Sequence, residues 1–171
     1  MRAYIGVDAR ISRKGITMAK RVHSGPEDCN CLAVRQAARH ITQFYDQFLA
    51  ASGLRTTQFS ILAKLRRLGP MTINALAAEM VMDRTTLGRN ILPLERDGLV
   101  AVQQGSRDRR SKELRVTAAG EARFRAGMKG WMQAQRRFEK AFGAKRTTDM
   151  RAILHAVTAT ELGTQAASAG N

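Results

Sequence analysis

The sequence has little of what several protein classes require. Only two cysteines occur among 171 residues, which excludes a disulfide-stapled scaffold and fits a reducing cytoplasm. No run of about 20 apolar residues occurs, so no membrane span is expected. The N-terminus is a poor signal peptide, because Asp8 and Arg10 interrupt its short apolar run. Acidic residues are scarce, with 14 Asp and Glu against 29 Lys and Arg.

The sequence also lacks the residue patterns of an enzyme. It shows no paired carboxylates, no glycine-rich phosphate loop and no nucleophile with an assignable base. A Cys-x-Cys metal site is disfavoured because His23 and His40 offer no ligand pattern. We therefore expect no catalytic residue, no metal and no cofactor.

What the chain does have is positive charge. The formal net charge is +15, the pI is near 11.3, and Arg outnumbers Lys 22 to 7. Such an excess favours an acidic partner, either nucleic acid or an anionic membrane surface. Arginine forks suit phosphate and groove contacts better than lysine does, which favours nucleic acid.

Hydrophobic spacing predicts a mainly helical chain with one small β-hairpin. A first helix is expected at 28–52, ended by Gly53, after a basic and poorly ordered tail at 1–27. Three short helices are expected within 53–97, a hairpin at 99–117 and two helices at 118–163, before a frayed end at 164–171. The expected N-caps are Asp28, Thr56, Thr72, Asp83 and Thr117.

A helix-turn-helix is predicted at 72–97, where two short helices are separated by Val81-Met82-Asp83. The early turns of a recognition helix reach base edges, where Arg suits guanine and Asn suits adenine. Thr hydroxyls more often hold phosphates. Pro93 should kink the second helix or confine its base-reading part to the residues before it. The candidate DNA-binding residues are Arg84, Thr85, Thr86, Arg89 and Asn90; a merely solvated helix face is the alternative.

The predicted hairpin turn is crowded with charge at Arg107, Asp108, Arg109 and Arg110. Three guanidinium groups repel one another unless a polyanion is near, and one Asp can hold one Arg extended. An extended Arg suits the narrow, electronegative minor groove. A helix-turn-helix followed by a basic hairpin is a winged helix, so these residues join the candidate DNA-binding set. A soluble charged turn is the alternative for Asp108 and Arg110.

These motifs resemble the MarR family of bacterial transcriptional regulators over roughly residues 28–162. The Asp-Arg-Arg wing followed by a Leu-x-Val-Thr-x-x-Gly run is the most specific part. The matching pieces are Gly53-Leu54-Arg55-Thr56-Thr57-Gln58-Phe59, Leu76-Ala77, Asp83-Arg84-Thr85-Thr86-Leu87, Leu94-Glu95-Arg96-Asp97-Gly98-Leu99-Val100, Asp108-Arg109-Arg110 and Leu114-Arg115-Val116-Thr117-Ala118-Ala119-Gly120.

The resemblance implies a homodimer on a pseudo-palindromic DNA operator, with recognition helices in major grooves and wings in minor grooves. It implies a repressor that a small ligand or oxidation releases. The dimer would form through the N-terminal helix (28–52) and the C-terminal helices (118–163), around a winged helix-turn-helix at 53–117. Apolar faces at both ends of the chain agree, notably the seam Phe124, Met128, Trp131, Gln135, Phe138 and Phe142.

Cys31 is a candidate redox sensor in the first turn of the first helix. In the organic-hydroperoxide-sensing branch of the family a reactive Cys occupies this position, and Tyr45 falls on one of that branch's two sulfur-binding tyrosines. The second of those positions is Arg35 here. Tyr45 lies roughly 21 Å from Cys31 along one helix, so a contact would have to cross a dimer. An inert, buried Cys31 is the alternative.

Two functional readings remain open at the level of sequence. The first is a dimeric, sequence-specific transcription factor. The second is a nonspecific nucleic-acid-binding or architectural protein that uses the same charge. The second reading gives no reason for Asp108 or for a polar recognition face.

Overall fold

The computed structural model of the protein describes residues 25–105 and 110–162. The chain forms two units, Met1–Ala38 and Arg39–Asn171. The described part of the first unit contains the 3-10 helix η1 (Pro26–Asp28) and the beginning of α1 (Asn30–Leu49), which continues into the second unit. Nearly all of the expected N-terminal tail and the whole expected C-terminal tail lie outside the described residues.

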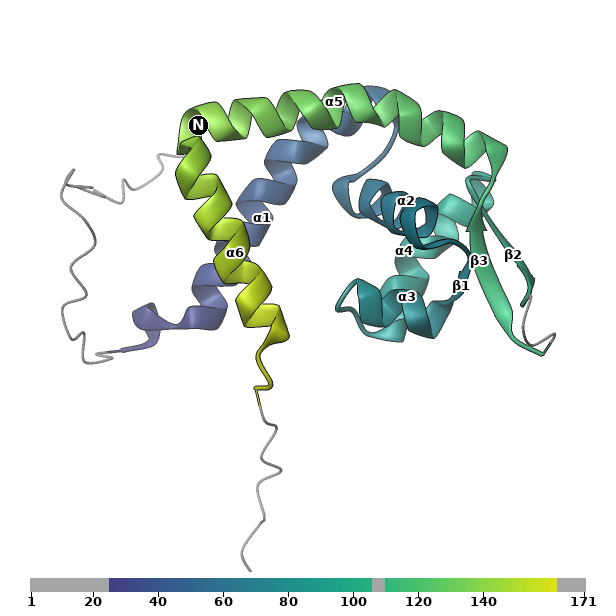
Figure 1. Ribbon diagram of the computed structural model, residues 1–171, viewed down its shortest axis with the longest axis horizontal. Coiled ribbons are helices and arrows are strands. Elements are labelled where there is room, and N and C mark those ends of the chain that lie inside the picture. Colours follow the sequence, from purple (N-terminus) through teal and green to yellow (C-terminus); the bar gives the residue numbers. More distant parts are fainter. Residues whose placement is uncertain (1–24, 106–109, 163–171) are drawn as a thin grey trace, which may run out of the picture. The chain divides into compact units, whose positions relative to one another are not determined.

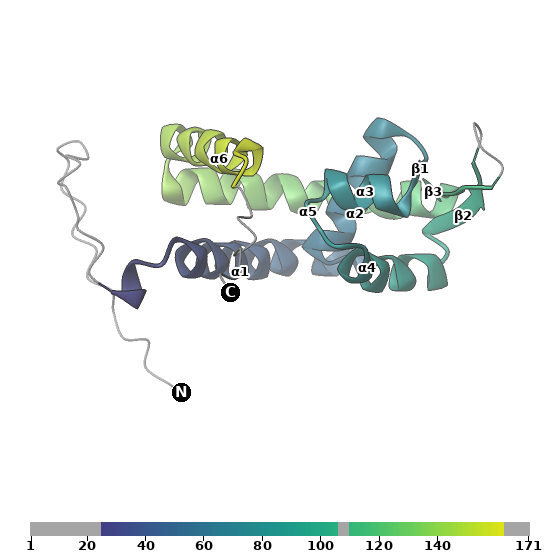
Figure 2. The same cartoon turned by 90° about the horizontal axis from the view of Figure 1, so that it is seen from below.

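The second unit is mainly helical and contains one small sheet (Figure 1). Both views place α2, α3, α4 and the strands beside the first half of α5, with α6 at its other end (Figures 1 and 2). This confirms the expected mainly α, winged helix-turn-helix class. After α1 the elements are η2 (Ala50–Ser52), α2 (Thr56–Leu68), β1 (Met71–Thr72), α3 (Ile73–Glu79), α4 (Arg84–Arg96), β2 (Val100–Gln104), β3 (Lys112–Val116), α5 (Ala118–Phe142) and α6 (Ala144–Ala159).

The sheet has three antiparallel strands in the order β1-β3-β2. The expected hairpin is β2 and β3, with Val102 opposite Leu114 and Gln104 opposite Lys112. The strand β1 was not expected, because two residues are too few to show an alternating pattern. Its Met71 pairs with Leu114, which ties the turn after α2 to the hairpin.

Three of the expected N-caps are confirmed. The side-chain oxygens of Thr72, Asp83 and Thr117 accept hydrogen bonds from backbone N–H groups three residues later, at 3.2, 2.8 and 3.0 Å. Each satisfies a donor that the first helical turn leaves unpaired.

The other two expected caps are wrong. Cys29, not Asp28, precedes α1, and its sulfur accepts the N–H of Leu32 at 3.4 Å. At α2 the N-cap is Arg55, and Thr56 is the first helical residue. Asp46 of α1 supplies the missing acceptor to Thr56 from ten residues away, which spacing along the sequence cannot reveal.

The core joins the winged helix to α5, and this corrects part of the expected dimer seam. Phe124 is buried and stacks on Phe59 of α2 at 4.7 Å between ring centroids. Trp131 also stacks on Phe59, at 6.1 Å. Phe138 contacts Phe44 of α1 at 6.3 Å, as the expected packing between the seam and the first helix requires. The seam is therefore largely occupied within one chain.

Among the described residues, no helix combines the length and the apolar character needed to cross a bilayer.

Candidate nucleic-acid interface

The helix α4 has one buried face and one exposed ridge. Leu87, Ile91 and Leu94 are buried in the core. At 3.6 residues per turn, the opposite side carries Thr85, Arg89 and Arg96, and all three are exposed. The helix continues through Pro93 to Arg96, so the ridge extends beyond the proline. This arrangement presents two guanidinium groups and a hydroxyl outward from one helix.

The sequence-predicted residues Thr86 and Asn90 both take part in hydrogen bonds local to this helix. The backbone N–H of Thr86 donates to Asp83 at 2.8 Å, and the amide of Asn90 donates to the Thr86 carbonyl at 2.8 Å. Hydrogen bonds from Thr86 hold the pKa of the Asp83 carboxyl below its ordinary value. Of the five candidates on this helix, Thr85 and Arg89 lie on the outward ridge, and Arg84 lies on a different side of the helix, toward the wing.

The wing is a regular hairpin whose tip lies outside the described residues. The N–H of Gly105 donates to the Ser111 carbonyl at 2.9 Å and continues the pairing of β2 with β3 toward the tip. Arg110 is exposed at the end of the described turn. The other three wing candidates, Arg107, Asp108 and Arg109, fall within the part that is not described.

Two basic residues on this side were not singled out from the sequence. Arg96 shares the α4 ridge with Arg89, and its Nε donates to Asp97 at 2.9 Å. Lys112 begins β3 and is exposed. A helical-wheel argument over the whole of α4 could have found Arg96. Lys112 could not have been placed on this side from the sequence, because its position depends on the register between β2 and β3.

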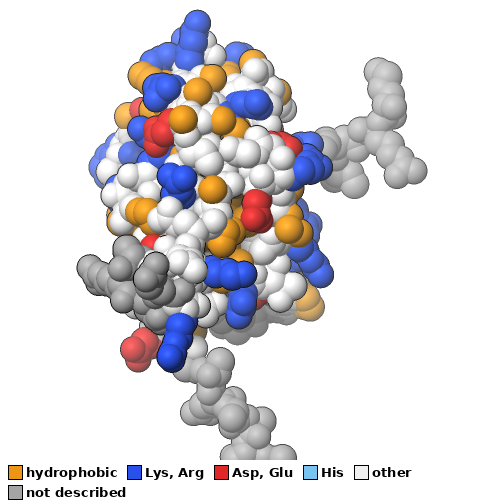
Figure 3. Space-filling view, turned by 90° about the vertical axis from the view of Figure 1, so that its right-hand side faces the viewer, with side chains coloured by type: hydrophobic (Ala, Val, Ile, Leu, Met, Phe, Trp, Pro, Cys, Tyr) orange, Lys and Arg blue, Asp and Glu red, His pale blue; other side chains and the backbone are white. Residues whose placement is uncertain are grey.

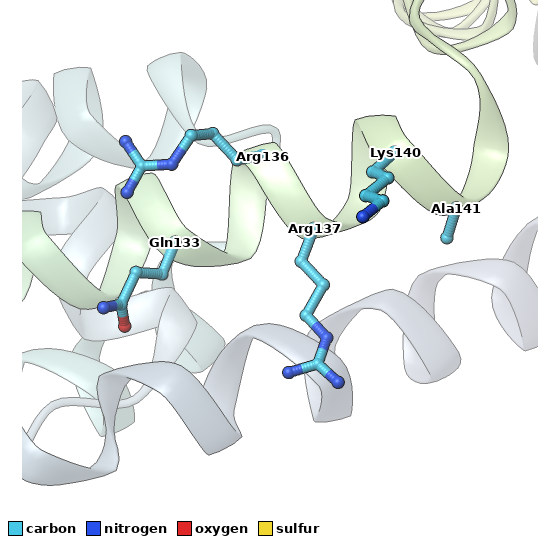
Figure 4. A pocket seen from close by; sticks show the side chains of 5 residues that line it. All are labelled: Gln133, Arg136, Arg137, Lys140 and Ala141. Carbon is cyan, nitrogen blue, oxygen red and sulfur yellow. The ribbon is translucent and has the colours of Figure 1, made fainter.

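Positive charge is not confined to α4 and the wing. Figure 3 views the end of the molecule that carries β2 and β3, where Lys and Arg groups are scattered among fewer acidic ones. A hollow of about 840 Å³ on α5 is lined by Gln133, Arg136, Arg137, Lys140 and Ala141, with Arg136 and Arg137 pointing away from each other (Figure 4). Charge alone therefore does not decide which surface meets nucleic acid.

Cys31 lies in the first turn of α1, as expected, and both it and Cys29 are exposed. Within a single chain, therefore, no other part of the described structure covers the Cys31 thiol. Tyr45 is buried in the second unit, and its burial raises the pKa of its hydroxyl; nearby Arg151 lowers that pKa and Glu139 raises it. Among the described residues, no group of His, Cys, Asp and Glu could hold a metal ion.

Comparison with known proteins decides the family. The MarR family model matches residues 54–112. The transcriptional regulator MosR of M. tuberculosis, solved in complex with DNA, is 36% identical; the match covers 77% of this chain and 98% of that one, with a TM-score of 0.66. The chain belongs to the MarR family. This family consists of DNA-binding transcriptional regulators with a winged helix, and not of enzymes, as expected from the sequence.

Two curated relatives are similar over shorter stretches. The HTH-type transcriptional regulator YwoH of Bacillus subtilis is 33% identical over 91 residues, or 53% of this chain and 66% of the relative. The transcriptional activatory protein BadR of Rhodopseudomonas palustris is 34% identical over 88 residues, half of each chain. The matches thus span 66% and 50% of these relatives' lengths.

Proposed function

We propose that this MarR-family protein is a homodimeric transcriptional repressor that binds a pseudo-palindromic DNA operator sequence-specifically. The observation that carries the proposal is the ridge of Thr85, Arg89 and Arg96 on α4, exposed beside a hairpin wing. Arg89 forms no ion pair with any residue that the structure describes, so its guanidinium is available to a base. The DNA complex of MosR supports the proposal, since that relative is 36% identical.

Dimer formation is supported by apolar surface that one chain leaves open. On α6, Ile153, Leu154 and Val157 are 64%, 40% and 47% exposed. On α1, Leu32 and Val34 are 46% and 48% exposed. A monomer rarely leaves such helix faces in water, and a symmetric dimer would cover each of them. Domain roles follow: α1, α5 and α6 would serve as dimerisation helices around the winged helix.

Selection from a random pool of DNA duplexes tests this proposal. The recovered sequences should contain an inverted repeat whose half-sites lie about 10–10.5 base pairs apart, because two recognition helices must enter successive major grooves. Sedimentation at micromolar concentration should show a dimer. Recovery of no preferred sequence, or a monomer in solution, would contradict the proposal.

Release by a small ligand is the first regulatory proposal. A cleft of about 770 Å³ lies between α2, α3, α5 and α6, and it is lined by Phe59, Arg67, Met80, Trp131 and His155 among others. Aromatic walls beside cationic groups suit a small aromatic anion. Trp131 is the sole tryptophan of the chain, so its fluorescence reports binding directly. A set of aromatic carboxylates should include one that quenches it saturably, and Arg67→Gln should weaken that binding.

Release by thiol oxidation is the second regulatory proposal. It would act through Cys31, with Cys29 as the other exposed thiol nearby. Oxidation to a sulfenate, followed by a mixed disulfide with a small cellular thiol, adds polar bulk to the α1 start. An organic hydroperoxide should release operator from the wild type but not from Cys31→Ser. Equal release of the operator from the wild type and from Cys31→Ser would show that Cys31 is not the switch.

The alternative, nonspecific nucleic-acid binding, is favoured by one observation, the additional basic surface on α5. Nonspecific binding would give similar affinities for selected and scrambled duplexes at one salt concentration. The selection experiment therefore separates the two functions.

A further inference from the structure

A hollow of about 340 Å³ lies between α4 and the inner side of the wing. Its lining is apolar at Ile73, Ile91, Leu92, Val102 and Leu114 and charged at Arg84, Glu95 and Lys112. Both cations, Arg84 and Lys112, are exposed. Neither cation forms an ion pair with any residue in the described part of the chain. The hollow thus brings together two cations, 28 positions apart in the sequence, that no described residue pairs.

The strand register explains why Lys112 faces this hollow. Side chains on one strand alternate between faces, so Lys112 and Leu114 share a face, and Leu114 is buried toward the core. On α4, Arg84 and Gly88 lie one turn apart on the side of the helix that borders the hollow. A Cβ at Gly88 would meet only Ile73, at 4.0 Å, so the helix surface beside Arg84 is bare.

We propose that this hollow seats a phosphate of the DNA backbone, held by Arg84 and Lys112. The inference rests on the proposed function. When α4 lies in a major groove and the wing lies in the adjacent minor groove, the sugar–phosphate strand separating those grooves passes between the two elements. Two cations in that gap neutralise a phosphodiester, and the absence of a side chain at Gly88 lets the strand approach the helix.

The assignment gives Arg84 a role different from that of Arg89. Arg84 positions the protein on the backbone, so its loss weakens binding to every sequence alike. The hollow also contains one exposed acid, Glu95, whose charge opposes a phosphate. Removal of that charge should have the opposite effect from removal of either cation.

Fluorescence-anisotropy titrations of DNA with the protein, between 50 and 200 mM salt, test this phosphate seat. They use a duplex recovered by selection and a scrambled duplex of equal length. Lys112→Gln and Arg84→Gln should each reduce the slope of log affinity against log salt by up to about 0.9, the contribution of one phosphate, and weaken binding about fivefold at 0.15 M salt, on both duplexes. Glu95→Gln should strengthen binding to both. Lys129→Gln, on α5, removes a matched charge outside the hollow and should leave the slope unchanged. Thermal melting confirms that each variant is folded.

A second experiment uses a duplex in which methylphosphonates replace the phosphates of the strand between the two grooves. This replacement removes the phosphate charge itself. On that duplex Lys112→Gln should cause no further loss. An equal loss on normal and neutralised duplexes, or a slope change no larger than that of Lys129→Gln, would overturn the proposal. If selection recovers no preferred sequence, the proposed function fails, and the salt slopes on the scrambled duplex still decide whether the seat exists.

Discussion

Asp46, near the end of α1, accepts hydrogen bonds from both the backbone N–H and the hydroxyl of Thr56, each 2.7 Å long. One carboxylate thereby caps α2 from a neighbouring helix and fixes the connection between the two. Asp46→Asn should lower the free energy of unfolding by about 1–2 kcal/mol, because charge-assisted caps contribute about that much. Urea unfolding of both proteins at pH 6 measures this difference in the free energy of unfolding. Asp149→Asn, an exposed carboxylate on α6, is the control and should change stability much less.

The same contact predicts a pH dependence. Burial raises the pKa of Asp46, but the hydrogen bonds from Thr56 and Arg55 outweigh it, so the folded pKa lies below the ordinary value. A depressed folded pKa means that Asp46 stabilises the fold above its unfolded pKa, about 3.9, and that this stability is lost as pH falls through the folded pKa. The difference between wild type and Asp46→Asn should therefore shrink below about pH 4. A difference that stays constant down to pH 2.5 would show that the carboxylate charge is irrelevant.

Replacing either of two helical glycines by alanine should change the stability of the fold, in opposite directions. A Cβ on Gly130 would collide with the backbone carbonyl oxygen of Phe48, where α5 crosses the end of α1. Gly130→Ala should therefore destabilise the fold by about 2 kcal/mol or more, since backbone cannot yield cheaply. Gly88→Ala meets no close atom and should stabilise by about 0.5–1 kcal/mol through helix propensity. Thermal melting of the two variants tests the close approach of α5 to α1. Changes of the same sign in the two melting temperatures would refute it.

The turn between α3 and α4 contains a strained residue. Val81 has φ 51°, a left-handed conformation that L side chains with a branched Cβ adopt rarely. The N–H of Met82 donates to the Ala77 carbonyl at 2.9 Å, so Val81 occupies a helix-ending position that usually holds glycine. Val81 is 74% exposed and little packing would be lost. Val81→Gly should raise stability by up to about 1 kcal/mol. Val81→Ala keeps the Cβ and should gain less; the reverse order would argue against strain.

Arg89 should carry base readout. If its guanidinium pairs with a guanine, Arg89→Gln should cost about 1–3 kcal/mol of binding free energy on the selected duplex and relax one base-pair preference. Repeating the selection with the variant shows which position is relaxed. A uniform loss on selected and scrambled duplexes would make Arg89 a phosphate contact instead.

Local patterns in the sequence predicted the elements that local physics determines. Thr72, Asp83 and Thr117 were expected as caps because a cap acts on the N–H three residues ahead. The long helices and the hairpin were expected because their apolar spacing is sustained. The α4 ridge followed in part from helical geometry, although Arg96 was missed beyond Pro93.

Contacts between distant segments could not be read in the same way. The strand β1 is defined by its partner Leu114, and the cap at Thr56 comes from Asp46. Phe124 and Trp131 have the spacing of a helix-packing seam, yet their partner is Phe59 in the same chain. Spacing identifies an apolar face but does not say which surface covers it.

The most direct test of sequence-specific recognition is the ratio of affinities for a selected duplex and its scrambled counterpart, measured with the same protein at 0.15 M salt. Backbone contacts contribute equally to both duplexes, so the ratio isolates base readout by α4 and the wing. Sequence-specific recognition by α4 and the wing predicts a ratio of at least about 10³, the lower end for specific DNA-binding proteins. A ratio near one would contradict it and leave a nonspecific, charge-driven binder.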